Sequence, residues 1–132
     1  MKLLDAYAHP EAAEILWRLL SEREAYQSIS HKRMPTWIAH RAFVEARPYL
    51  HWYLIDCGDI VGSVYLTDKR EIGIAILRGF RGNGYGRLAV LQILEKHPGP
   101  AIANINPNNR SSIDMFRDLG FQHTAVTYEL AS

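Results

Sequence analysis

The sequence has only one cysteine, Cys57, so no disulfide can form within the chain. A chain without disulfides is typical of a reducing compartment. It also lacks any apolar run of the ~18 residues needed to span a membrane, and its first residues lack the apolar stretch of a signal peptide. These absences predict a cytoplasmic protein without a membrane segment.

An excess of charge of either sign is also missing. The chain has 15 basic and 14 acidic residues, which gives a net charge of +1. Because nucleic-acid-binding domains usually carry a strongly basic face, we expect no nucleic-acid partner. The six histidines show no metal-ligand spacing, so we expect no bound metal.

Length and composition predict one domain over residues 1–132. Domains usually have about 100–200 residues, and the chain's 48% hydrophobic and 22% charged residues are ordinary for a soluble globular protein. A chain of this length can bury roughly two thirds of its unfolded surface, so a core can form without a disulfide or a structural metal.

The residue pattern predicts a mixed α/β fold with an antiparallel meander in its middle. A first helix is expected to begin at Pro10, and a second between Pro35 and Pro48, after the polar loop 26–34. The other expected elements are, in chain order, an edge strand at 2–8, strands at 49–55, 60–66 and 71–77, a helix from 88, a strand at 101–105, a helix at 111–119 and a last strand at 121–130.

The strand 71–77 has an unusual face. Alternation places three isoleucines on one side and Glu71, Gly73 and Ala75 on the other. Glycine and alanine leave little side chain above the backbone, so we expect another group to lie close to this strand.

A glycine-rich turn, Arg81 to Arg87, lies between that strand and the following helix. The unpaired N–H groups and the positive dipole end of a helix favour an anion, usually a phosphate. A Walker loop would need Gly-Lys-Ser/Thr, but Gly86 is followed by Arg87 and Leu88. The even spacing of the three glycines also differs from the dinucleotide fingerprint G-x-G-x-x-G.

The pattern Arg81-x-x-Gly84-x-Gly86 resembles the coenzyme A signature Q/R-x-x-G-x-G/A of the GNAT superfamily of N-acetyltransferases. A second block, from Asn109 to Phe121, is similar to the family pattern N-x-x-A/S-I-x-x-Y-x-x-x-G-F. The resemblance covers about residues 49–130. It implies an α/β (α+β) domain with a mixed, mostly antiparallel sheet of six or seven strands and about four helices. Two strands would splay apart to admit coenzyme A.

The resemblance further implies acetyl-CoA as the cofactor. The turn would hold the pyrophosphate with its backbone N–H groups, the arm of the cofactor would lie between the splayed strands, and a strand N–H would polarise the thioester. The expected contact residues are Ile74, Ala75, Ile76, Arg81, Gly82, Asn83, Gly84, Tyr85, Gly86, Arg87, Asn109, Ser112 and Phe116.

The implied reaction is direct transfer of the acetyl group to a primary amine. A lysine-like amine has a pKa of about 10.4 and needs a base at neutral pH. Glu71 is the first candidate, because it opens the strand beside the expected thioester, and His31 and His51 are the alternatives. Family members commonly use a tyrosine as general acid where this chain has Phe116; Tyr128 is our candidate, and Tyr65 and Tyr85 are alternatives.

The acceptor is expected to be a small-molecule amine bound by His31, Trp37 and His51. The polar, basic loop 26–34 suits an anionic acceptor such as a nucleotide-linked amino sugar, while a peptide N-terminus and a small polyamine stay open. The protein is expected to be a monomer or a homodimer. The alternative to an enzyme is a non-catalytic acyl-CoA-binding or regulatory module, which the phenylalanine at position 116 favours.

Overall fold

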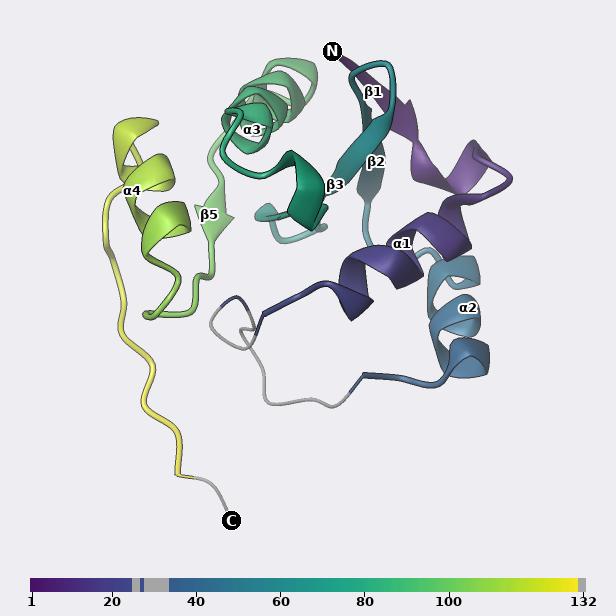
Figure 1. The fold of residues 1–132 in the computed structure, drawn as a ribbon. Coiled ribbons are helices and arrows are strands. Elements are labelled where there is room, and N and C mark those ends of the chain that lie inside the picture. Colours follow the sequence, from purple (N-terminus) through teal and green to yellow (C-terminus); the bar gives the residue numbers. More distant parts are fainter. Residues whose placement is uncertain (25–26, 28–33, 131–132) are drawn as a thin grey trace.

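The computed structural model of the chain describes residues 1–24, 27 and 34–130. Five strands in this part form one sheet in sequential order (Figure 1). Neighbouring strands are antiparallel except the last pair, which is parallel. The strands are β1 (Lys2–Asp5), β2 (His51–Asp56), β3 (Ile60–Leu66), β4 (Glu71–Ile76) and β5 (Ile102–Ala103).

Helices cover both faces of the sheet. The first pair lies on one face and the second pair on the other (Figure 1). The helices are α1 (Ala12–Ser21), α2 (Trp37–Glu45), α3 (Tyr85–Lys96) and α4 (Arg110–Asp118), with short 3-10 turns η1 (Ala6–Ala8) and η3 (Arg78–Phe80). None of these helices is long and apolar enough to cross a bilayer.

Each face of the sheet has its own hydrophobic core, because successive strand residues point to opposite faces. Leu54 of β2 packs with Leu16 of α1 in one core. Val64 of β3 packs with Val90 of α3 in the other. The sheet is therefore the middle layer of three, as expected for an α+β domain.

Local sequence signals set the ends of two helices. The hydroxyl of Thr36 accepts a hydrogen bond from the N–H of Ala39 (3.2 Å) and caps α2. After α4, Gly120 adopts a φ of 96°, and the N–H of Phe121 donates to the carbonyl of Phe116 (2.9 Å). This left-handed glycine closes the helix, as glycine does most readily.

The predicted fold class is confirmed, but the predicted strand count of six or seven is wrong. The described residues form five strands, and 121–130 is not one of them. Val126, Tyr128 and Leu130 alternate with polar residues as in a strand, yet all three are exposed. Alternation shows that a segment suits a sheet, but it does not supply a partner strand.

Two smaller boundaries also differ. The predicted buried strand at 101–105 pairs over Ile102 and Ala103 alone, and Ile102 is half exposed. The first helix begins at Ala12 and not at Pro10, because residues 10 and 11 form a turn.

Candidate active site

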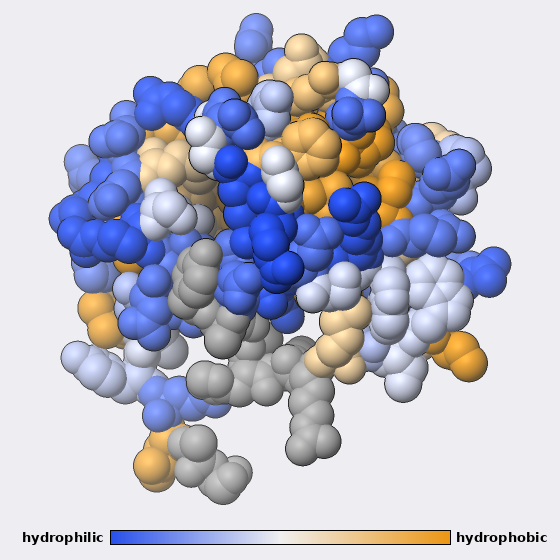
Figure 2. Space-filling model, viewed as in Figure 1, coloured by the Kyte–Doolittle hydropathy of each residue, from blue (hydrophilic) through white to orange (hydrophobic). Residues whose placement is uncertain are grey.

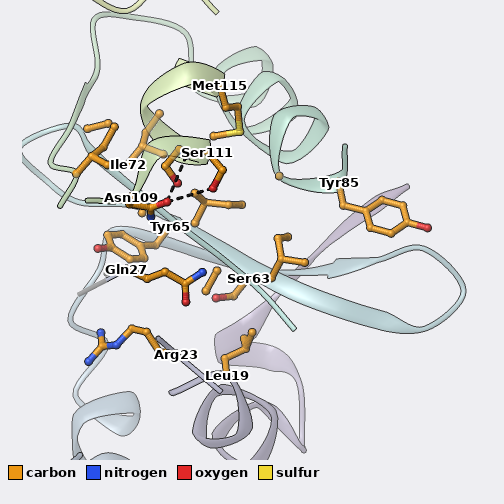
Figure 3. Close-up of a pocket in the computed structure, with 18 of the residues that line it drawn as sticks. Leu19, Arg23, Gln27, Ser63, Tyr65, Ile72, Tyr85, Asn109, Ser111 and Met115 are labelled. Atoms are coloured by element: carbon orange, nitrogen blue, oxygen red, sulfur yellow. Dashed lines mark hydrogen bonds between the residues drawn. The ribbon is translucent and has the colours of Figure 1, made fainter. Parts of the chain in front are cut away.

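A cavity of about 660 Å³ opens where β4 and β5 separate. The two strands pair only at Glu71 with Ile102 and at Ile72 with Ala103, so the rest of β4 has no partner strand on this side in the described chain. Residues from both faces of the sheet line the cavity (Figure 3). The splay therefore connects the two faces at this edge.

The open part of β4 offers backbone hydrogen-bonding groups to the cavity. The N–H of Leu77 donates to the carbonyl of Val61 (2.8 Å). Because antiparallel partners bond through alternate residues, the N–H and C=O groups of Ile74 and Ile76 face away from β3 and toward the gap. Both residues line the cavity. The polarisation of a thioester by a backbone N–H of this strand stays a prediction.

The glycine turn forms one end of the cavity. Gly82 and Gly84 have φ values of 80° and 78°, which glycine adopts at little cost. The helix α3 has no side-chain cap, and the Leu88 N–H is the first to bond inside it, to the Gly84 carbonyl (3.2 Å). The N–H groups of residues 85–87 therefore lack intrahelical partners and, with the helix dipole, favour an anion.

Arg81 holds the turn against the end of α1. Its guanidinium donates to the carbonyls of Ile76 (3.1 Å) and Glu22 (3.2 Å) and to Oε1 of Gln27 (3.4 Å). The side chain that the sequence placed beside a pyrophosphate thus has three protein partners. Hydrophilic residues gather in this region, between the start of α3 and the end of α1 (Figure 2).

Asn83 also supports the turn. Its Nδ2 donates to the Phe80 carbonyl (3.1 Å), and Asn83 is absent from the cavity wall. Arg87, in contrast, is exposed, lines the cavity and makes no ion pair with another described residue. Arg87 is therefore the arginine of the turn that is available to a bound phosphate.

The start of α4 forms the opposite wall. Asn109 is buried, and its Oδ1 accepts hydrogen bonds from Ser111 Oγ (3.2 Å) and the Ser112 N–H (3.3 Å) (Figure 3). Its Nδ2 has no hydrogen-bond partner within the described chain. Phe116 is buried, and its ring packs edge-on against Phe121 at a centroid distance of 5.0 Å. All except Phe121 line the cavity.

Gly73 makes room for an aromatic ring. Tyr65 lies opposite Gly73 in the β3–β4 ladder, and a Cβ atom at Gly73 would overlap the Tyr65 ring. The group that the sequence predicted close to this strand is therefore a side chain of the protein itself.

The Tyr65 ring also stacks on Tyr49, with a centroid distance of 3.8 Å and an interplanar angle of 5°. Burial raises the pKa of the Tyr65 hydroxyl, a hydrogen bond from Tyr49 lowers it in part, and the charge of Glu71 raises it again. Tyr65 therefore stays protonated at neutral pH and can donate a proton into the cavity.

Glu71 begins β4 on the same sheet face as Tyr65 and Gly73. Its backbone N–H donates to Thr67 Oγ1 (3.0 Å), which fixes the start of the strand. Its half-buried side chain lines the cavity, and the carboxylate makes no hydrogen bond or ion pair with another described residue. The carboxylate is free to accept a proton from a bound amine.

Two of the residues predicted for the acceptor site lie outside the cavity. The ring of Trp37 is 5.5 Å from that of Trp17 and 5.8 Å from that of His40, and Trp37 does not line the cavity. His51 stacks on His97 at 3.6 Å, and alternation along β2 puts it on the α3 side of the sheet, opposite Glu71.

The other two predicted residues are at the margins of the described chain. Tyr128 is 93% exposed, beyond α4, and does not line the cavity. His31 lies outside the described residues. No group of three or more His, Cys, Asp or Glu residues in the described part of the chain is arranged to hold a metal.

Sequence reasoning missed several cavity residues. Ser63 and Tyr49 line the cavity, and the alternation of β3 could have placed Ser63 beside Tyr65 on the face of Gly73. Arg23 and Gln27 follow α1 and reach the cavity only because Arg81 and its neighbours bind the end of that helix. No local pattern signals a contact of that kind.

Comparisons with known proteins agree with this geometry. The model of the family described as Acetyltransferase (GNAT) matches residues 11–121. A domain from Methanocaldococcus jannaschii has 26% identity, covers 97% of this chain and 93% of that chain, and has a TM-score of 0.77. No curated protein matches significantly.

Two further solved structures share the fold at lower identity. One is a proposed acetyltransferase from Salmonella typhimurium with its cofactor acetyl-CoA, with 19% identity, 94% and 79% coverage and a TM-score of 0.67. The other is a ribosomal-protein-alanine N-acetyltransferase from Brucella melitensis, with 17% identity, 95% and 86% coverage and a TM-score of 0.68.

Proposed function

Because the chain belongs to the GNAT acetyltransferase family, whose cofactor is acetyl-CoA, we propose that it transfers an acetyl group from acetyl-CoA directly to a primary amine. Residues 1–132 would act as a single acetyltransferase domain. One observation carries the proposal: a single cavity contains the N–H groups of the glycine turn, the open edge of β4 and the carboxylate of Glu71.

The residues present fit the cofactor. The unpaired N–H groups of residues 85–87, with Arg87, would hold its pyrophosphate. Asn109, Ser112 and Phe116 would border its arm, and the N–H of Ile74 would donate to the thioester carbonyl, where negative charge develops. When bound, acetyl-CoA supplies an acetyl thioester, and acetyl transfer to an amine releases a thiol.

Glu71 is the proposed base. A lysine-like amine with a pKa near 10.4 is almost fully protonated at pH 7, and forming its free base costs on the order of 4–5 kcal/mol. A carboxylate in contact with the ammonium, directly or through water, offsets part of this cost by accepting the proton.

Tyr65 is the proposed acid, in preference to Tyr128. Tyr65 lines the cavity and remains protonated at neutral pH, whereas Tyr128 is exposed outside it. Phe116 has no proton to donate. A thiolate is a good leaving group because the thiol pKa is about 8.5, so the acid's contribution should be modest.

The acceptor that the sequence suggests, a nucleotide-linked amino sugar, rests on the basic loop 26–34, most of which lies outside the described residues. The alternative function, a non-catalytic acyl-CoA-binding module, makes a different prediction: tight acetyl-CoA binding with no thiol release with any amine. A screen of amines that follows free thiol from acetyl-CoA separates the two.

Replacing Gly84 tests the cofactor site. A tryptophan there should weaken acetyl-CoA binding by roughly tenfold or more, about 1.4 kcal/mol, because its side chain would stand at the phosphate end of the cavity. Gly58→Trp is the matched control, because Gly58 also has a positive φ (100°) and open space around it, but lies in the β2–β3 turn. Calorimetric titration measures both; unchanged affinity in Gly84→Trp would rule out the placement.

A further inference from the structure

The half of the cavity on the α1/α2 side of the sheet is lined mainly by apolar side chains. Its aromatic and aliphatic lining residues are Leu16, Leu19, Leu20, Phe43, Tyr49, Trp52 and Tyr65. Tyr49 and Tyr65 are only half buried. Because the two rings stack face to face, their outward edges and the neighbouring apolar side chains form an aromatic wall along this half of the cavity.

The aromatic wall is held in place before any ligand binds. Tyr49 lies edge-on to Trp52 with a centroid distance of 4.7 Å, in addition to its stacking on Tyr65. Its backbone is bound twice by Tyr7, whose hydroxyl donates to the Tyr49 carbonyl (2.6 Å) and accepts from its N–H (3.0 Å). A pre-organised wall lowers the ordering cost of binding.

The polar groups of this half are few and include charges of both signs. Glu71 provides the negative charge and Arg23 the positive charge. The Arg23 side chain makes no hydrogen bond or ion pair with any residue that the structure describes, and in Figure 3 it points to the same side of the cavity as the Tyr65 hydroxyl. Both charges act on that hydroxyl, because Glu71 raises its pKa and Arg23 lowers it.

Ser63 adds one neutral polar group. Ser63 is 6% exposed and lines the cavity, and its hydroxyl has no hydrogen-bond partner among the described residues. The two tyrosine hydroxyls, Gln27 and the Trp52 indole N–H also belong to this lining, and the indole N–H has no hydrogen-bond partner in the described chain. The site can therefore satisfy one ammonium, one anion and a few further polar atoms.

From this arrangement we propose that the acceptor is an aromatic α-amino acid. Its ring would lie on the wall of Tyr49 and Tyr65, its ammonium group would face Glu71, and its carboxylate would face Arg23. The inference rests on the proposed acetyl transfer. The amino nitrogen forms a bond to the acetyl carbon, the carbon–sulfur bond breaks, one ammonium proton passes to Glu71 and a second ends on the thiol.

Other amines fit this half of the cavity less well. An amino sugar would bring several hydroxyl groups against apolar side chains, and each unpaired polar group costs about 1–3 kcal/mol. A polyamine would leave Arg23 without an anion and the aromatic wall without a matching surface. A peptide N-terminus has an amide in place of the free carboxylate.

The test compares acceptors with and without the carboxylate. Initial rates of thiol release would be measured at saturating acetyl-CoA with L-phenylalanine, 2-phenylethylamine, a nucleotide-linked amino sugar and spermidine. We expect the highest kcat/KM for L-phenylalanine.

Arg23→Gln tests the carboxylate contact. It should lower kcat/KM about tenfold for L-phenylalanine, because one charge-assisted contact is worth about 1.5–3 kcal/mol, and it should leave kcat/KM for 2-phenylethylamine nearly unchanged. Arg41→Gln, on the outer side of α2, is the matched control and should change neither value.

The outcomes separate this inference from the proposed function. A preference for the amino sugar or for spermidine would overturn the inference and leave acetyl transfer intact. Equal losses for phenylalanine and phenylethylamine in Arg23→Gln would remove Arg23 as the carboxylate contact and overturn it too. Binding of acetyl-CoA without thiol release for any amine would overturn both.

Discussion

Glu71 combines two roles at one position. Its backbone N–H donates to Thr67 and so fixes the start of β4. Its side chain lines the cavity, and the carboxylate has no hydrogen bond or ion pair with another described residue. Glu71→Gln keeps the size and the backbone but removes the base. We expect kcat at pH 7 to fall about 10²-fold, the lower end of the range for general-base catalysis. Because a larger fraction of the amine is already unprotonated at high pH, the difference in kcat between Glu71→Gln and the unmodified protein should shrink as pH rises toward 9.

A pH–rate profile of Glu71→Gln checks this prediction. Glu95→Gln, an exposed change on α3, is the control and should match the unmodified protein. A deficit that stays constant across the profile would assign Glu71 a structural role instead.

Tyr65 and Tyr128 allow a paired test of the acid. Removing one hydroxyl in Tyr65→Phe keeps the ring over Gly73, so we expect the fold to persist and kcat to drop about tenfold, below the usual range for acid catalysis because a thiolate leaves readily. Tyr128→Phe should leave kcat unchanged, because that side chain is 93% exposed. The prediction fails if the two variants have equal rates in a thiol-release assay.

At the scale of single residues, the sequence indicated residues at the glycine-turn end of the cavity better than residues on its α1/α2 side. Gly82, Gly84 and Asn109 belong to recognisable motifs, and a motif constrains backbone shape locally. Arg23 and Tyr49 carry no motif. They reach the cavity through contacts between segments far apart in the sequence, which a local pattern does not encode.

At the scale of elements, the β3–β4 pair depends on a missing side chain. Gly73→Ala would place a Cβ atom in the Tyr65 ring. Since the ring also stacks on Tyr49, it has little freedom to move. We expect a loss of about 1–3 kcal/mol in the free energy of unfolding, as for other overpacked sites.

Urea unfolding measures that loss. Gly79→Ala, in η3, is the control, because nothing lies within 4 Å of a Cβ atom there. In a Tyr65→Ala background, Gly73→Ala should cost much less, since the obstructing ring is gone. An equal cost in both backgrounds would show that the ring is not the cause.

Elements were predictable where the chain pairs with its sequence neighbours. The meander β2–β3–β4 follows the alternating pattern, because short turns bring consecutive strands together. The segments 101–105 and 121–130 needed partners from elsewhere, and the apolar pattern alone overestimated their pairing. The short β5 is also what leaves the edge of β4 open for the cavity.

At the scale of the whole molecule, His97 joins the end of α3 to the sheet. Its Nε2 lies 2.7 Å from the Tyr53 hydroxyl, its ring stacks on His51, and its carbonyl accepts from Arg70 Nη2 (2.7 Å). Burial, and then the positive charges of His51, Lys96 and Arg70, lower the pKa of His97.

The lowered pKa predicts how stability depends on pH. In the unfolded chain His97 takes up a proton near its ordinary pKa of about 6.5, whereas the folded protein resists protonation to a lower pH. The unfolded state therefore binds more protons in this window, and the contribution of His97 is complete above about pH 7 and declines as pH falls below 6.5. His97→Gln should reduce the change in the urea unfolding midpoint between pH 7 and pH 5. His123→Gln, in the exposed C-terminal segment, should not reduce it. If the urea midpoint of His97→Gln changed with pH as much as that of the unmodified protein, this prediction would be wrong. Other titratable groups would then cause the loss of stability at low pH.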